Sequence, residues 1–161
     1  MDTFVLRQGS EADAAAIAGL VNVAFLVEKF FVDGDRIAPD EVKRLLGKGS
    51  FWLIEEHQSL TGCVYVELKG ERAYMGLLSV APSRQGAGFG RRLVAAAEKY
   101  ASDGGCKFMD LRAVNVRSEL VPFYVNLGYR EEGISPFPPE VPTKIPCHFI
   151  LMAKSLIDAA L

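Results

Sequence analysis

The sequence predicts a mixed α/β (α+β) fold in which one central sheet of six to seven strands, mostly antiparallel, packs against about four helices. Two observations predict this class. Three strand-like segments in series are separated only by short turns, and a later unit runs strand, glycine-rich turn, helix and strand. The 161 residues are 50% hydrophobic and have the length of one globular domain, so we expect a single domain over residues 1–161.

The first third of the chain predicts one strand followed by two helices. Residues 4–7 have the apolar character of a short strand, and Ser10-x-x-Asp13 is typical of a helix cap. The apolar residues that follow recur with the helical period. Pro39 begins a second short helix, which ends at the glycines of residues 47–49.

The next part of the chain predicts a meander of three strands. Residues 51–54, 61–68 and 73–80 are each rich in β-branched or aromatic side chains. Polar turns at residues 56–58 and 69–71 separate them. Because connections this short join antiparallel neighbours, we expect the three strands to pair in series.

The second half predicts a parallel crossover. Residues 90–102 have the helical period, and two glycines end this helix before residues 107–114 return to a strand pattern. A helix between two strands favours parallel pairing of those strands. A short helix capped by Gly128 and a last strand over residues 148–152 complete the expected fold.

Charge and cysteine content argue against several kinds of partner. The chain has 18 Lys and Arg residues against 20 Asp and Glu residues, and no basic stripe suited to nucleic acid. Cys63, Cys106 and Cys147 lack the spacing of metal ligands, so we expect reduced thiols and no metal. The apolar stretch of residues 14–27 is too short to span a bilayer. We expect a cytoplasmic protein without a signal peptide and without membrane or nucleic-acid partners.

The turn over residues 85–90 carries the most information about function. Pro82 stops the preceding strand, and three glycines leave backbone amides uncovered before a helix, whose N-terminus favours an anion such as a pyrophosphate. Two rival phosphate motifs are absent. Residues 47–50 lack the spacing of a P-loop, and Arg91 stands where a dinucleotide fold has its third glycine. Arg91 itself suits a phosphate contact and a solvated helix start equally well.

The pattern Gln85-x-x-Gly88-x-Gly90 after this strand resembles the acetyl-coenzyme A signature of the GNAT (GCN5-related N-acetyltransferase) superfamily. The resemblance covers nearly the whole chain, because the order of the elements agrees as well. The residues that fall where the family has its second motif are Asn115, Phe123, Tyr124, Leu127, Gly128 and Tyr129. The resemblance implies a GNAT-like fold whose strands splay apart at the coenzyme A site.

The resemblance also implies which residues bind acetyl-CoA as the acyl donor. Backbone amides of the turn would hold the pyrophosphate, and the strand before it would pair with the pantetheine arm. The full set that it implies is Leu78, Ser79, Val80, Gln85, Gly86, Ala87, Gly88, Phe89, Gly90, Arg91, Asn115, Arg117 and Tyr124. Because the segment from Asn115 to Tyr124 is longer than the family's shorter form, Asn115 also fits a turn cap and Arg117 also fits solvent.

For the chemistry, the resemblance implies that Tyr124 protonates the departing thiolate and that the backbone amide of Val80 polarises the thioester carbonyl. From the residues alone, Tyr124 also fits a half-buried aromatic. The glutamate that many relatives place on the strand before the turn is absent. Glu67, His148 or an ordered water is left to take the proton of the amine, although Glu67 also fits a solvent-facing position and His148 a structural one.

Acceptor recognition is expected in two segments, because the resemblance places it after the first helix and in the hairpin before the last strand. Residues 28–36 and 135–146 occupy these places. The candidate substrate contacts are Glu28, Phe31, Asp33, Phe137 and His148. A solvated acidic loop and a stiff proline loop are the alternative interpretations.

Taken together, the motifs predict an acetyl-CoA-dependent N-acetyltransferase, monomeric or homodimeric, that acts on a primary amine of a small molecule or peptide. The sequence does not identify that amine. The alternative is a non-catalytic regulatory module that binds coenzyme A or another phosphorylated ligand, and the missing strand glutamate is the feature that favours it.

Overall fold

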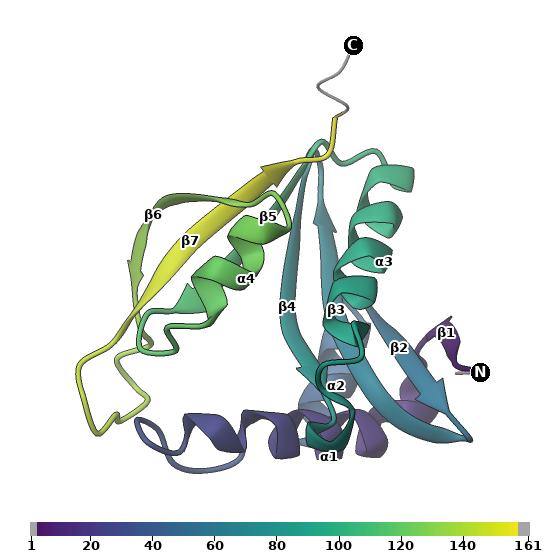
Figure 1. The fold of residues 1–161 in the computed structure, drawn as a ribbon, viewed down its shortest axis with the longest axis horizontal. Coiled ribbons are helices and arrows are strands. Elements are labelled where there is room, and N and C mark those ends of the chain that lie inside the picture. Colours follow the sequence, from purple (N-terminus) through teal and green to yellow (C-terminus); the bar gives the residue numbers. More distant parts are fainter. Residues whose placement is uncertain (1–2, 158–161) are drawn as a thin grey trace.

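In the computed structural model, which describes residues 3–157, the chain forms one open sheet of seven strands with apolar cores on both faces (Figure 1). The elements in chain order are β1 (Val5–Gln8), η1 (Glu11–Asp13), α1 (Ala14–Ala24), η2 (Phe25–Glu28), α2 (Pro39–Leu46), β2 (Ser50–Glu56), β3 (Ser59–Lys69), β4 (Arg72–Val80), η3 (Pro82–Arg84), α3 (Phe89–Asp103), β5 (Phe108–Val114), α4 (Leu120–Asn126), β6 (Arg130–Pro136) and β7 (His148–Ser155). These elements confirm the predicted mixed fold.

The sheet has the strand order β1-β2-β3-β4-β5-β7-β6 and is mostly antiparallel. The strands β2, β3 and β4 form the predicted antiparallel meander. The strands β4 and β5, which α3 connects, pair in parallel as the crossover requires. The last strand, β7, lies between β5 and β6 and pairs with both in antiparallel fashion.

Two apolar cores fix the helices to the sheet, one on each face. Phe51 and Leu53 of β2 belong to the core that contains α1 and α2, whereas Ile54 belongs to the core that contains Leu93 of α3. Successive side chains of a strand point to opposite faces, which explains the division. All four side chains are completely buried, and burial of each contributes about 1.5–3 kcal/mol. The helices that border the cavity are therefore firmly held.

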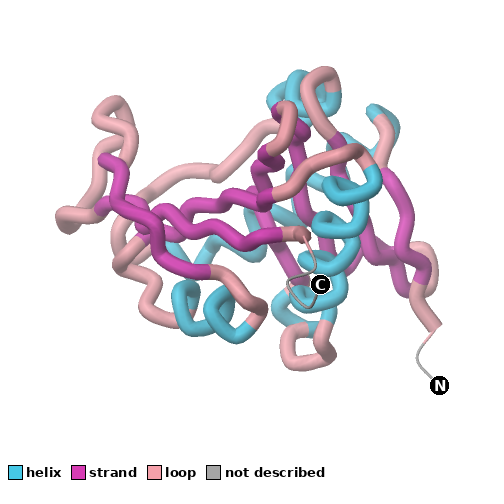
Figure 2. The backbone as a smooth tube through the Cα atoms, turned by 90° about the horizontal axis from the view of Figure 1, so that it is seen from above, coloured by secondary structure: helices cyan, strands magenta, loops and turns pink. Residues whose placement is uncertain are grey.

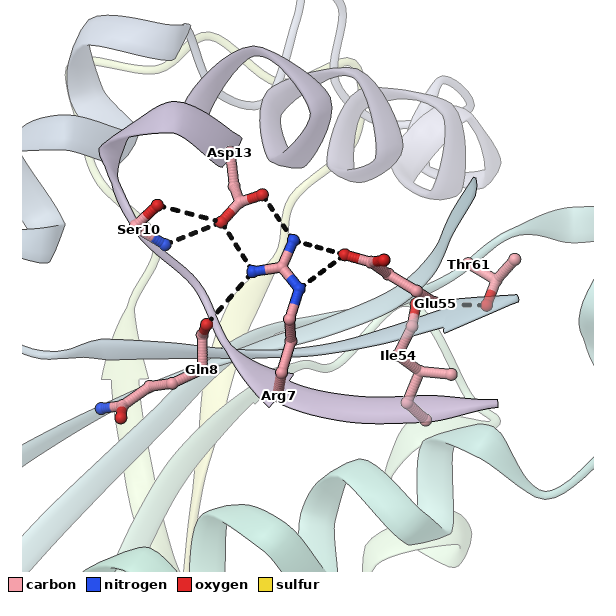
Figure 3. A network of polar contacts seen from close by, with 7 residues as sticks. All are labelled: Arg7, Gln8, Ser10, Asp13, Ile54, Glu55 and Thr61. Carbon is pink, nitrogen blue, oxygen red and sulfur yellow. Dashed lines mark hydrogen bonds and ion pairs between the residues drawn. The ribbon is translucent and has the colours of Figure 1, made fainter. Parts of the chain in front are cut away.

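Arg7 of β1 ties the N-terminal strand to the first helical turn (Figure 3). Its guanidinium donates hydrogen bonds to Asp13 at 2.7 and 2.9 Å and to Glu55 of β2 at 2.6 Å. Asp13 also accepts the backbone N–H of Ser10 at 2.8 Å, which confirms the predicted cap. The hydrogen bonds from Arg7 lower the pKa of Asp13 to about 2. This network anchors a strand that is only four residues long.

The strand β6 differs from the prediction, which has no strand between the helix at Gly128 and residue 148. Its first residues, Arg130, Glu131 and Glu132, are charged and exposed, and its pairing with β7 shifts between Glu131 and Gly133. Charged side chains and bulges protect an edge strand from pairing with other chains. The same features remove the apolar alternation that identifies a strand in a sequence.

The strands β4 and β5 pair only at their beginnings, and this positions the site. Their register ends where Tyr74 lies opposite Asp110, and beyond this point the two strands diverge. Figure 1 shows the resulting V, with α1 running across its wide end. From above, β1 and the loop between β6 and β7 lie at opposite ends of the molecule (Figure 2). The predicted splay is confirmed, and the diverging half of β4 presents backbone groups that β5 does not pair.

Candidate active site

One large cavity of about 780 Å³ opens where β4 and β5 diverge. Its wall includes the second half of β4, the glycine turn, the start of α3, β5, α4, η2 and the loop between β6 and β7. The expected donor residues that line it are Leu78, Val80, Gln85, Gly86, Gly88, Phe89, Gly90, Arg91, Arg117 and Tyr124. The expected acceptor residues that line it are Glu28, Asp33 and Phe137. Donor and acceptor candidates therefore share one space.

The glycine turn has the backbone conformation that its sequence predicts. Gly86 and Gly88 have φ values of +86° and +84°, and Gly88 is the N-cap residue of α3. A Cβ added at either position would meet no atom within 4 Å, so the backbone angle, not crowding, requires glycine here. The turn thus leaves open space in front of the N-terminus of a 15-residue helix, where backbone N–H groups and the helix dipole favour an anion.

Arginines flank the turn in two different ways. Arg84 donates to Glu56 at 2.6 and 2.9 Å and lies over the ring of Phe89, with 5.2 Å between its Cζ atom and the ring centroid. These contacts fasten the turn to the end of β2. Arg91 is exposed and lines the cavity at the start of α3.

A β-bulge interrupts the regular pairing of β4 with β3 beside the cavity. Gly76 pairs with Tyr65 and Ser79 pairs with Cys63, which leaves Leu77 and Leu78 opposite a single residue of β3. Leu77 has a φ of +55°, an unfavourable value for a branched side chain, and its carbonyl oxygen accepts a hydrogen bond from Ser79 Oγ at 3.0 Å. Such bulges turn backbone groups away from the regular ladder. Sequence analysis missed this bulge, and Gly76 beside it is the only local signal.

Tyr124 lies in α4 and is 8% exposed. Its ring packs edge-to-face against Phe123 and Tyr129, at centroid distances of 5.0 and 5.8 Å. Burial raises the pKa of Tyr124 to about 12. No described residue forms a hydrogen bond with its hydroxyl, although the residue lines the cavity. The hydroxyl therefore stays protonated at neutral pH and is available to a bound molecule.

Glu28 and Arg117 form an ion pair in the cavity wall. Arg117 Nη1 donates to Glu28 Oε2 at 3.1 Å, joining residues that are 89 positions apart. Arg117 also donates to Glu119 at 3.1 Å through Nε and through Nη2. Burial raises the pKa of Glu28, and the charge of Arg117 opposes this rise. The sequence assigned the two residues to different ends of the site, whereas the structure pairs them.

The two expected acceptor segments contact each other. Phe31 is completely buried and packs edge-to-face on Phe137, with 6.2 Å between ring centroids. Phe137 also packs on Phe149 at 5.1 Å. The backbone N–H of Lys144 donates to the carbonyl oxygen of Phe31 at 2.8 Å. Phe137 and Phe149 line the cavity, whereas Phe31 lies outside the lining and contacts the ring of Phe137. Sequence analysis did not single out Phe149, although it follows a named candidate, His148.

The structure does not bring every candidate to the cavity. Those outside its lining are Phe31, Glu67, Ser79, Ala87, Asn115 and His148. Glu67 accepts a hydrogen bond from Tyr65 at 2.9 Å and pairs with Lys69 at 3.0 Å, and these contacts lower its pKa.

Asn115 joins two strands instead of facing the cavity. Its Oδ1 accepts the backbone N–H of His148 at 2.8 Å, and its own N–H donates to the carbonyl oxygen of His148 at 2.9 Å. These two bonds connect the end of β5 to the start of β7. These contacts join two strands and are not the local turn cap that the sequence suggests, and a contact of Asn115 with pantetheine stays a prediction.

Residues 3–157 show neither a cluster of metal ligands nor a membrane-spanning helix. These residues contain no group of three or more His, Cys, Asp or Glu side chains arranged to hold a metal ion. In the same range, no helix has the length and apolar character needed to cross a membrane. All three cysteines are free thiols; Cys63 and Cys106 are buried and Cys147 is partly exposed.

Comparison with known proteins relates this chain to one family. A model of the acetyltransferase (GNAT) family matches residues 21–129, more than half of the chain. Ard1 from Thermoplasma volcanium superposes with a TM-score of 0.80 at 14% identity, over 96% of this chain and 99% of that one. The ribosomal-protein-S18-alanine N-acetyltransferase from Escherichia coli gives 0.77 at 14% identity, over 98% and 96%. YncA from Salmonella typhimurium, solved with its cofactor acetyl-CoA, gives 0.73 at 22% identity, over 98% and 96%.

Proposed function

The chain belongs to the GNAT family of acetyltransferases, and on this premise we propose that it transfers the acetyl group of acetyl-CoA to a primary amine of a small molecule or peptide. One observation carries the proposal: a single cavity joins the glycine turn, the diverging half of β4 and Tyr124. Such a cavity suits a long donor whose phosphates and thioester bind at separate places. A solved neighbour with bound acetyl-CoA supports this choice of donor.

In the proposed complex, the backbone holds most of the donor. The amides of residues 85–90 bind the pyrophosphate, with Arg91 beside them. The stretch Leu78, Ser79 and Val80 pairs with the amide groups of the pantetheine arm, because β5 leaves this part of β4 unpaired. Open space before Gly86 and Gly88 supports this assignment, since a phosphate needs direct access to the backbone.

The proposed reaction is a direct transfer in a ternary complex. A neutral amine attacks the thioester carbonyl, and a backbone N–H of β4 near Val80 stabilises the oxygen as charge develops on it. A C–N bond forms and the C–S bond breaks. Tyr124 then donates its proton to the departing thiolate. This step requires a protonated Tyr124 at neutral pH, and the raised pKa of Tyr124 meets that requirement.

We also propose that the enzyme is cytoplasmic, acts as a monomer or homodimer, and needs no metal. The reason for the last point is chemical: a neutral amine attacks a thioester without a Lewis acid once the carbonyl oxygen has a hydrogen-bond donor. Activity that persists after treatment with EDTA would support it. Loss of activity, restored by one divalent ion, would overturn it.

Release of free thiol from acetyl-CoA tests the proposal. The purified chain is incubated with amino acids, polyamines, aminoglycosides and peptides with free N-termini, and thiol is measured against a no-amine blank. We expect amine-dependent release with at least one class. If acetyl-CoA binds but no amine accelerates thiol release, the chain is a coenzyme A binding module and the catalytic proposal is wrong. If acetyl-CoA does not bind, both assignments are wrong.

A further inference from the structure

We infer that Glu28 is the base that takes a proton from the acceptor ammonium group, and that Arg117 positions its carboxylate. This inference rests on the proposed acetyl transfer, and it supplies the group that the strand before the turn lacks. The observation behind it is the ion pair of these two side chains in the cavity wall. No local motif indicates it, because η2 and the segment between β5 and α4 meet only in the folded chain.

The base and the acid enter the cavity from different elements. Glu28 ends η2, whereas Tyr124 lies in α4, and both line the same space. Burial raises the pKa of both groups, and the charge of Arg117 opposes that rise at both. One guanidinium thus acts on the two groups at once. An amine that reaches Glu28 is therefore in the same cavity as the hydroxyl that would protonate the leaving thiolate.

The contacts of Glu28 leave one carboxylate oxygen for a substrate. Oε2 accepts the hydrogen bond from Arg117, while no described residue donates a hydrogen bond to Oε1. The Glu28 side chain is only 11% exposed, and the residue lines the cavity. Arg117 is itself fixed by Glu119 and is 17% exposed. The anchored carboxylate therefore has a defined position, which proton transfer in a ternary complex requires.

The charges that face Glu28 come from two segments. Arg117 and Glu119 belong to the segment between β5 and α4, and Arg36 belongs to the loop before α2. Burial raises the pKa of Glu28, Arg117 and Arg36 lower it, and Glu119 raises it again. The resulting carboxyl holds a proton more readily than a solvated glutamate does, as a base for an ammonium group should.

The two side chains that sequence analysis offered as bases lack this placement. Glu67 lies outside the cavity lining, and its contacts with Lys69 and Tyr65 lower its pKa. His148 also lies outside the lining, at the start of β7. Of the two glutamates, Glu28 is therefore the one that lines the cavity and has a raised pKa.

Two protons leave the acceptor nitrogen, and one proton reaches the departing thiolate. The acceptor nitrogen, R–NH₃⁺, gives one proton to Glu28 and becomes the neutral nucleophile. After the C–N bond forms, the nitrogen loses a second proton to water. Tyr124 protonates the thiolate and recovers a proton through solvent, while Glu28 releases its proton to solvent. The net products are the N-acetyl amine, coenzyme A thiol and one proton.

Glu28→Gln tests the inference because it keeps the shape of the side chain and removes its basicity. For an acceptor whose ammonium pKa lies above the assay pH, we expect kcat/KM to fall about 100-fold, with acetyl-CoA affinity unchanged. For an acceptor whose ammonium pKa lies below the assay pH, the loss should shrink to a few fold, because that amine needs no base. An equal loss for both kinds of acceptor would indicate a structural role and overturn the inference.

Glu67→Gln is the matched comparison, since it is the same substitution at the rival carboxylate. We expect it to keep kcat/KM within about twofold of the unmodified chain, and a loss confined to Glu67→Gln would reverse the assignment. Melting temperature and acetyl-CoA affinity, measured for both variants, check that each is folded. If Glu28→Gln fails to fold, Glu28→Asp and the pH profile of the Arg117 variants decide the question.

The positioning role of Arg117 predicts a shift in pH dependence. The acidic limb of kcat/KM reports the base that must lose its proton. Arg117→Met removes a charge that lowers the Glu28 pKa, so the limb should move to higher pH. Arg117→Lys keeps the charge and should leave the limb near its original position. An acidic limb that neither variant moves would overturn the role given to Arg117.

These experiments separate the inference from the function on which it rests. If the unmodified chain releases no thiol with any amine, the proposed function fails and the inference falls with it. If the unmodified chain turns over and Glu28→Gln is equally fast for amines of high pKa, the transfer stands and the inference alone is wrong.

Discussion

The two ends of the cavity are built in different ways. At the proposed donor end, residues 85–88 and the start of α3 are continuous in the chain, and the backbone faces open space at Gly86 and Gly88. At the proposed acceptor end, Glu28, Arg117 and Phe137 come from three segments far apart in the chain. The first end uses main-chain groups that every residue has, whereas the second uses particular side chains. Side-chain substitutions are therefore expected to alter the acceptor end more than the donor end.

This difference has a physical consequence for specificity. A pyrophosphate presents the same charge and shape in every acetyl-CoA molecule, so a fixed backbone cradle is sufficient for it. An amine substrate must be distinguished from many others, and discrimination depends on the polar and aromatic groups that surround it. We therefore expect substitutions at each end to affect one substrate and spare the other.

Tyr124→Phe should produce the largest effect, because Tyr124 is the proposed acid of the reaction and lines the cavity. We expect kcat to fall about 100-fold, since the variant has no proton for the thiolate, and we expect acetyl-CoA affinity to stay nearly unchanged. Single-turnover thiol release with the best acceptor measures this. An unaltered rate would remove Tyr124 as the acid.

Tyr129→Phe is the matched control. Its hydroxyl donates to Glu98 at 2.7 Å and the residue does not line the cavity, so this variant should lose about 1 kcal/mol of stability and keep its kcat.

The pH profile of the unmodified chain gives a second test of Tyr124. Because burial raises the pKa of Tyr124 to about 12, the acid form persists well above neutrality, and kcat should show no alkaline decline from Tyr124 up to about pH 10.

Gly88→Val should have the next largest effect and should act at the donor end alone. Valine strongly disfavours the φ of +84° at this position, and the resulting strain of about 1–3 kcal/mol is expected to distort the cradle. We expect acetyl-CoA affinity to weaken about 20-fold and the acceptor KM to change little. Isothermal titration with acetyl-CoA measures the first quantity.

Gly105→Val tests whether that loss belongs to the site. Gly105 has a φ of +91° and open space around it, but it lies at the far end of α3 from the turn. This variant should lose similar stability and bind acetyl-CoA normally. Equal loss of donor affinity in both variants would mean that general destabilisation, not the cradle, explains the effect.

The proposed donor end is easier to predict from the sequence than the proposed acceptor end. The donor turn is contiguous, and its glycines and the proline before it are local signals, so its position and conformation are predictable. The pairing of Glu28 with Arg117 depends on how η2 meets the segment after β5, and no local pattern encodes it. The positive φ of Leu77 is equally unpredictable, since leucine is normal in a regular strand.

Two further differences have physical reasons. Asn115 was expected to contact either pantetheine or a turn, and only the folded structure shows that β7 lies within reach of its side chain. The strand β6 is polar because it is an edge strand, and this polarity hides it in the sequence. In both cases the deciding partner is β7, the last strand of the chain, which lies between β5 and β6 in the sheet and so cannot be placed by sequence order.

Phe137→Ala should weaken the acceptor end and leave the donor end intact. It removes the ring that packs on Phe31 and Phe149 and that lines the cavity. We expect kcat/KM for the acceptor to fall about fivefold to tenfold, with acetyl-CoA affinity unchanged. Initial rates at saturating acetyl-CoA measure it. A drop in donor affinity instead would show that the two ends are not separable in this way.

Lys144→Met should give the smallest effect, because it removes only an exposed contact between the two acceptor segments. Lys144 Nζ lies 3.1 Å from Asp33 and 2.9 Å from the carbonyl oxygen of Lys29, and the Lys144 and Asp33 side chains are 50% and 72% exposed. Solvent screens such a pair, so we expect a change in melting temperature of about 1–2 °C and less than a twofold change in acceptor KM. Thermal scans at low and high salt measure the first quantity.

Lys99→Met serves as the control, since it removes an exposed ion pair with Asp103 on α3, at positions outside the cavity lining. If both variants behave alike, the aromatic contact of Phe31 with Phe137 and the backbone bond from Lys144 hold the acceptor wall together. If Lys144→Met raises the acceptor KM severalfold while Lys99→Met does not, the charge of Lys144 positions that wall. The acceptor end would then depend on electrostatics as well as on packing.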